Sequence, residues 1–186
     1  DIATEIFTRL NVGGKPLTPF EIMVAKSYDP DLKFDLADRY QSLIESLKEI
    51  EYETLPESSI LQTISILAKG DAKRKVILAL TKDEVIDNWS KMEHGLKSAI
   101  DYFRSAYRIP ASRLLPYPGL IIPFTYFFHE LNGPSPTGNQ ARFLEDFFWR
   151  VSLSGRYSQS VESRSVQDIK RMRDILENKR PTYDWA

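Results

Sequence analysis

A group of residue types that can bind phosphate stands close to the N-terminus of the chain. Arg9 can hold a phosphate or a carboxylate with two parallel hydrogen bonds. Asn11 can donate a hydrogen bond to a phosphate or a sugar, or fix a turn through its own side chain. Gly13 and Gly14 let the backbone approach a ligand closely, and Glu21 follows, either as a helix cap or as a group that orients Asn11. These five residues are candidates for one binding site.

The Gly13-Gly14-Lys15 sequence does not complete a phosphate loop of the Walker type. That loop needs a further glycine upstream and a serine or threonine after the lysine, whereas Pro16 follows Lys15 here. Taken alone, the two glycines are typical of a turn between helices.

The sequence gives little indication of a metal site or of cysteine chemistry. There is no cysteine, which excludes disulfides, thiolate metal sites and a catalytic thiol, and the two histidines, His94 and His129, lie far apart. Asp31 and Lys33 faintly echo a metal-nuclease signature. That chemistry needs the second acid and the lysine on an adjoining strand, whereas here they stand together at an expected helix start. We therefore expect no metal site.

Arg156-Tyr157 is a second candidate for a functional role. It follows an aromatic helical pattern and a Ser154-Gly155 break. Two interpretations stay open: a secondary site, or a helix end at which Arg156 pairs with a carboxylate.

The elements that must position these residues are expected to be helical. Apolar residues recur at helical spacing along most of the chain, which predicts an all-α fold: an irregular bundle of about seven or eight helices with little or no strand. Thr18 with Glu21, and Thr81 with Glu84, have the spacing of capping boxes, so each pair predicts a helix start. Residues 120–131 are apolar nearly all round, which predicts a central buried helix.

The C-terminal part of the chain allows two further expectations. Ser165 with Asp168 has the spacing of a third capping box, which predicts that the last helix begins there. The remaining residues, 179–186, are polar and are expected to form an irregular tail.

The charge balance limits the classes of partner. The chain has 25 basic and 26 acidic residues and a formal net charge of -1, so no overall basic field attracts nucleic acid. Local basic runs, residues 69–75 and 164–173, are more typical of solvated helix faces. The longest apolar stretch, residues 120–128, is far below the roughly 20 residues of a membrane span, so we expect no membrane segment and a cytoplasmic protein.

Residues 6–22, with the sequence IFTRLNVGGKPLTPFEI, resemble the second motif of a ParB-like family. The family is the N-terminal domain of GmrS-type subunits of modification-dependent restriction systems. Its pattern there is Ile/Val-Phe-x-Arg-Ile/Leu-Asn-x-Gly-Gly-x-x-Leu-x-x-x-Glu, and every fixed element is present. Weaker similarity to the helical region of the family continues through Phe148-Trp149, the Ser154-to-Ser158 segment and Asp168.

The resemblance implies a nucleotide-dependent protein of DNA restriction and phage defence. It makes Arg9, Asn11, Gly13, Gly14 and Glu21 candidate nucleotide-binding residues. In the family, a ParB-like core with an Asp-Gly-Gln-Gln-Arg motif lies upstream, an HNH-type nuclease module acts as a partner, and a nucleoside triphosphate with Mg²⁺ is implied. Because the core motif and the nuclease module are absent from this sequence, the resemblance implies a catalytically incomplete chain with no cofactor of its own.

The resemblance also implies a division of the chain. Residues 1–27 would be the end of the nucleotide-site region, a helix, an Asn-x-Gly-Gly turn and a second helix. Residues 28–178 would be a helical domain, and residues 179–186 a tail. Asp1 already falls within a helical pattern, so we expect further sequence upstream.

Two other readings stay open. The chain could be a helical module that contacts protein or DNA and has no catalytic role. That reading predicts an exposed apolar or basic surface, around residues 73–75 or around Tyr102 and Tyr107. The chain could also be a purely structural helical domain, in which the Gly-Gly turn only separates two helices.

Overall fold

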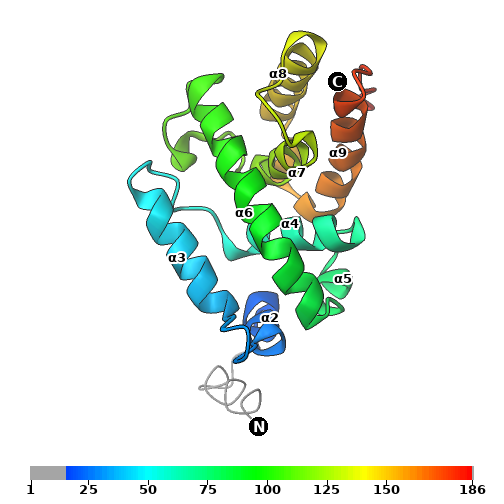
Figure 1. Cartoon of the computed structure of the whole chain (residues 1–186). Coiled ribbons are helices and arrows are strands. Elements are labelled where there is room, and N and C mark those ends of the chain that lie inside the picture. The colour runs from blue at the N-terminus through cyan, green and yellow to red at the C-terminus, as the bar shows by residue number, and fades with distance from the viewer. Residues whose placement is uncertain (1–15, 186) are drawn as a thin grey trace.

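The computed structural model describes residues 16–185 (Figure 1). It confirms an all-α fold for that range, with no strand beyond one isolated bridge between Asp29 and Phe34. Eight α-helices lie within it: α2 (Pro19–Ser27), α3 (Leu36–Lys48), α4 (Glu57–Lys69), α5 (Arg74–Leu78), α6 (Lys82–Ser105), α7 (Ile121–Leu131), α8 (Gly138–Leu153) and α9 (Val161–Leu176). Three short 3-10 helices connect them: η1 (Ser112–Leu114), η2 (Pro118–Leu120) and η3 (Arg156–Ser158).

Both capping boxes expected near the starts of α2 and α6 are confirmed. At the start of α6 the Thr81 hydroxyl accepts a hydrogen bond from the backbone N–H of Glu84 at 3.2 Å, and the Glu84 carboxylate accepts from the N–H of Thr81 at 3.0 Å. The pair satisfies two of the N–H groups that a helix start leaves without partners. These starts were predictable because all their partners lie within four residues.

The capping box expected at Ser165 and Asp168 is wrong. Helix α9 begins one turn earlier, after Ser160, and both residues are buried within it. The Ser165 hydroxyl donates to the carbonyl of Val161 at 2.7 Å, and the Asp168 carboxylate binds arginine side chains. The Ser-x-x-Asp spacing is also the spacing of about one helical turn, so the same pattern occurs within helices as well as at their starts.

Helix α7 is the central element of the fold, as its apolar sequence predicts. Residues 121–128 are all buried, and α7 packs against α4, α6 and α9. The rings of Phe103, Phe124 and Phe148 meet there, and Tyr107 stacks on Phe148 with ring centroids 4.3 Å apart. No helix among the described residues is both long and apolar enough to cross a membrane.

Tyr102 and Tyr107 do not form the exposed surface that the interaction-module reading predicts. Tyr102 is buried, and its ring lies edge-on to Tyr107 at 5.2 Å. Burial raises the pKa of both phenols above the ordinary value. Helix α6 ends at Ser105, so Tyr107 folds back over the core instead of continuing the helix outward.

Gly95 sets the closest approach of α6 to α7. A Cβ atom at this position would lie 2.5 Å from the backbone oxygen of Thr125, which is far inside van der Waals contact. Only glycine allows the two helix backbones to pack at this separation.

We expect Gly95→Ala to destabilise the fold by about 1–3 kcal/mol, because the added methyl group overpacks a backbone-to-backbone contact. Helix propensity alone would change stability by about 1 kcal/mol in the opposite direction. Urea unfolding followed by circular dichroism measures the difference. Ser90→Ala, on the exposed side of the same helix, should change stability by less than about 0.5 kcal/mol. If Gly95→Ala and Ser90→Ala had the same stability, Gly95 would not be required for the close packing of α6 against Thr125.

Candidate functional site

Of the candidate binding residues near the N-terminus, Glu21 belongs to the described part of the chain, and Arg9, Asn11, Gly13 and Gly14 lie outside it. Glu21 closes the capping box of α2, where its carboxylate accepts a hydrogen bond from the backbone N–H of Thr18 at 2.7 Å. Pro19 occupies the first turn, where a missing N–H costs nothing. Glu21 therefore fixes the start of α2, in line with the structural interpretation of its position.

A cavity of about 550 Å³ lies beside the start of α2, and we call it the α2–α4 cavity. Thr18 and Pro19, the end of the motif segment, form part of its wall. Five helices contribute apolar and charged side chains to the rest of its lining: Phe20, Tyr40, Leu61, Glu57, Arg74 and Glu162. The cavity therefore combines an apolar surface with charges of both signs.

Glu57 is a carboxylate of this cavity, and its surroundings change its pKa. Partial burial raises its pKa above the ordinary value, and the nearby negative charge of Glu21 raises it further. Both carboxylates stand in the first turn of a helix, where the helix dipole favours negative charge.

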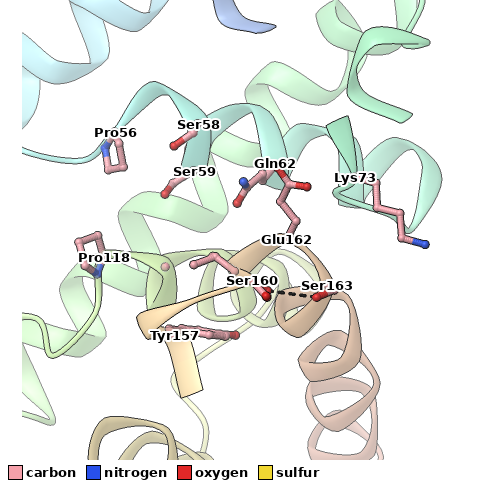
Figure 2. Close-up of a pocket in the computed structure, with 12 residues that line it drawn as sticks. Pro56, Ser58, Ser59, Gln62, Lys73, Pro118, Tyr157, Ser160, Glu162 and Ser163 are labelled. Carbon is pink, nitrogen blue, oxygen red and sulfur yellow. Dashed lines mark hydrogen bonds between the residues drawn. The ribbon is translucent and has the colours of Figure 1, made fainter. Parts of the chain in front are cut away.

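A second cavity, of about 600 Å³, lies between the first turns of α4 and α9, and we call it the α4–α9 cavity. Figure 2 shows Ser59 and Gln62 of α4 on one side, and Tyr157 with Ser160 on the other. Four residues line both cavities: Pro56, Ser58, Gln62 and Glu162. The two cavities therefore adjoin along the N-terminal half of α4.

Gly119 permits the close packing that shapes one wall of the α4–α9 cavity. A Cβ atom on Gly119 would lie 2.8 Å from Cγ1 of Val161 and 3.4 Å from Cδ2 of Tyr157. Since η2 packs this tightly against η3 and the start of α9, the position of the α9 first turn depends on a residue without a side chain. Ser160, which precedes α9, adopts a left-handed backbone with φ of 55°.

The basic run at residues 69–75 reaches both cavities. Lys73 lines the α4–α9 cavity and Arg74 the α2–α4 cavity, and both side chains are exposed. Lys73 has one ion pair, with Asp71 at 3.7 Å, and Lys69 pairs with Glu84. Most of the run is a solvated surface, as expected, but two of its cations stand at cavity edges.

Arg156 and Tyr157 belong to a buried network around Asp168. The Asp168 carboxylate accepts hydrogen bonds from Nε of Arg156 at 2.9 Å, from the Tyr157 hydroxyl at 2.7 Å and from Arg171 at 2.9 Å. Arg156 also donates to the side chain of Gln167 at 2.9 Å. Both interpretations of the sequence name Arg156, and the geometry matches the one in which it pairs with a carboxylate.

Burial dominates the electrostatics of this network. It raises the pKa of Asp168 above the ordinary carboxyl value, against the opposing effect of Arg156 and the Tyr157 hydroxyl. Burial also raises the pKa of Tyr157 well above that of a free phenol. The Tyr157 hydroxyl is held by Asp168 while its ring lines the α4–α9 cavity. The network thereby fixes one wall of that cavity.

The chain after α9 packs onto the same network. As expected, residues 179–185 contain no helix. The guanidinium of Arg156 lies 3.8 Å from the ring centroid of Trp185, and that of Arg171 lies 4.3 Å away. Arg171 also pairs with Asp184 at 2.7 Å. Cation–π contacts and one ion pair therefore tie this polar-looking segment to the buried carboxylate.

Sequence reasoning missed the polar side chains that face the cavities. Ser59 and Gln62 lie among apolar residues of α4, and their residue types alone are typical of an exposed helix surface. The one local signal is the start of α4, where Pro56 takes the N-cap position without a capping side chain. No group of three or more histidine or acidic residues that could hold a metal ion lies within residues 16–185.

Comparison with family models, with curated proteins and with solved structures finds no match for this chain.

We expect Asp168→Ala to destabilise the fold by about 3–5 kcal/mol, because it leaves two buried or half-buried guanidinium groups without their shared carboxylate. Chemical denaturation measures the change. Asp174→Ala, on a half-exposed position of the same helix, should cost less than about 1 kcal/mol. If both variants lost the same stability, the network would not be a principal support of the C-terminal region.

Proposed function

We propose that the chain is the helical part of a ParB-like, nucleotide-dependent protein of DNA restriction and phage defence. The observation that carries the proposal is the pattern of residues 6–22, in which every fixed element of the family motif is present. In this proposal Arg9, Asn11, Gly13 and Gly14 form one side of a nucleotide site. The opposite side, with the Asp-Gly-Gln-Gln-Arg motif, belongs to a ParB-like core upstream.

The described end of the motif is compatible with this role. Phosphoryl chemistry depends on positioning and on electrostatic stabilisation more than on covalent catalysis, so the donors must sit on a rigid element. Thr18 and Glu21 cap α2, and Phe20 and Met23 anchor that helix in the core. The α2–α4 cavity beside it has a volume within the usual range of small-molecule sites.

The proposal divides the chemistry between this chain and other parts of the protein, as the resemblance implies. Hydrolysis of a nucleoside triphosphate needs a group that positions water and a Mg²⁺ ion on the phosphates. In the proposal those come from the upstream core, and DNA cleavage comes from an HNH-type nuclease module. The chain itself supplies phosphate donors and a helical platform.

A second candidate function is a protein-interaction module. It is favoured by Trp149 and Leu153, which lie one turn apart on α8 and are 50% and 82% exposed. Large apolar side chains in such a pair are typical of contact surfaces between proteins.

Nucleotide binding distinguishes the two functions. We expect a form of the protein extended upstream to bind ATP, GTP or CTP with Mg²⁺, and Asn11→Ala to weaken that binding at least tenfold. Equilibrium titration of each nucleotide, with and without Mg²⁺, measures the affinities of both the extended form and the present chain. We expect the extended form to bind more tightly than the present chain, because each side of the proposed site holds only part of the phosphate donors.

Asn139→Ala, at the exposed start of α8, is the matched control and should leave the affinity unchanged. Thermal unfolding of all variants separates binding from folding. If neither form bound any of the nucleotides, the nucleotide-dependent function would be abandoned in favour of the interaction module. Equal losses of binding and stability in Asn11→Ala would leave Asn11 as a turn residue.

A further inference from the structure

Two helix N-termini converge on the α4–α9 cavity. Pro56, Ser58 and Ser59 at the start of α4 and residues 160–163 at the start of α9 line it. Neither helix has a side chain that caps its first turn. First-turn N–H groups without a capping side chain keep their capacity to donate hydrogen bonds, and the helix dipoles add partial positive charge. The cavity therefore offers donors from two directions.

Two buried polar side chains aim into the same space without a partner. Gln62 is 8% exposed and Ser59 is 4% exposed, and neither side chain makes a hydrogen bond to any other described residue. Figure 2 shows both pointing from α4 toward the side of the cavity formed by α9. Both side chains are nine-tenths buried, yet their polar atoms are not among the fully enclosed atoms that lack a partner. The polar atoms of Ser59 and Gln62 therefore keep contact with the space of the cavity and can donate to a ligand there.

The charged groups of the cavity are Lys73 and Glu162. Lys73 stands at the rim with its ammonium turned outward in Figure 2, and among residues 16–185 its one ion pair is with Asp71, at 3.7 Å. A flexible lysine of this kind can turn toward an anion. Glu162 lies in the first turn of α9, half-buried. Its carboxylate opposes a fully ionised anion and accepts a hydrogen bond from a protonated one.

We propose that the α4–α9 cavity binds the phosphate group of a small molecule. Backbone N–H groups of α4 and α9, the hydroxyl of Ser59 and the amide of Gln62 donate to its oxygen atoms, and Lys73 balances its charge. This site is separate from the proposed nucleotide site, which involves residues 9–14, and does not depend on it. No atom of the phosphate is transferred: the site is a binding site.

Glu162 gives the site its selectivity. Inorganic phosphate still carries a proton near neutral pH, and a phosphate monoester carries one below its second pKa of about 6. In that pH range one oxygen of either group can donate to the Glu162 carboxylate, so the titration is made at about pH 6. Sulfate has the same shape but no proton, so it meets the carboxylate as an uncompensated negative charge. The geometry therefore favours phosphate over sulfate, and Glu162→Gln, whose amide can donate, should abolish that preference.

Isothermal titration in a phosphate-free buffer tests the proposal, with inorganic phosphate, sulfate and glycerol 3-phosphate as probes. Gln62→Leu and Ser59→Ala should each weaken phosphate binding about tenfold, the scale of a lost hydrogen bond to a charged group. Neither should lower stability appreciably, because no hydrogen bond between described residues is lost when either side chain is replaced. Gln41→Leu, on the exposed face of α3, is the matched control and should change neither property.

Each outcome of the titration decides the question. Tighter binding of glycerol 3-phosphate than of phosphate would identify the ligand as a phosphorylated small molecule, and the reverse order would identify free phosphate. Absence of binding of both at millimolar concentration would overturn the proposal, as would equal binding of sulfate and phosphate by the unaltered chain. Gln62→Leu with unchanged affinity would also overturn it, since Gln62 is the buried donor on which it rests.

Discussion

The burial of α7 is the constraint on which the rest of the structure depends. Its sequence is apolar on all sides, so neighbouring helices must cover it from several directions. Gly95 allows α6 to lie against one side at backbone distance, while α4 and α9 cover others. Because α4 and α9 both pack on α7, their first turns meet at one place and enclose the α4–α9 cavity. The candidate site is thus a consequence of how the core helix is covered.

The buried Asp168 network has a different kind of influence. An isolated carboxylate in the interior would be very costly, and here Arg156, Arg171 and the Tyr157 hydroxyl compensate it. The same arginines stack on Trp185, so one carboxylate joins η3, α9 and the chain beyond it. Desolvation offsets much of the attraction within such a network, so its cost appears chiefly when one partner is removed and the others stay buried.

The fold was predictable from sequence where the determinants are local. The capping boxes at Thr18 and Thr81 and the apolar run of α7 involve neighbours in the chain, and all three held. The Ser165–Asp168 pair failed because its role is set by Arg156, which lies outside the helix. The cavities were not predictable for the same reason: Gln62, Glu162 and Lys73 come to line one cavity only through the packing of α4, α5 and α9.

The charges around the two cavities indicate what each can bind. The α2–α4 cavity holds Glu57, whose pKa is raised by burial and by Glu21, together with Arg74, and so suits a ligand with apolar surface and polar groups of both kinds. The α4–α9 cavity has donors from two helix starts and a single carboxylate, which suits a compact anion that still carries a proton. Gln62 and Glu162 line both cavities, so the different chemistry of the two cavities comes from the residues that they do not share.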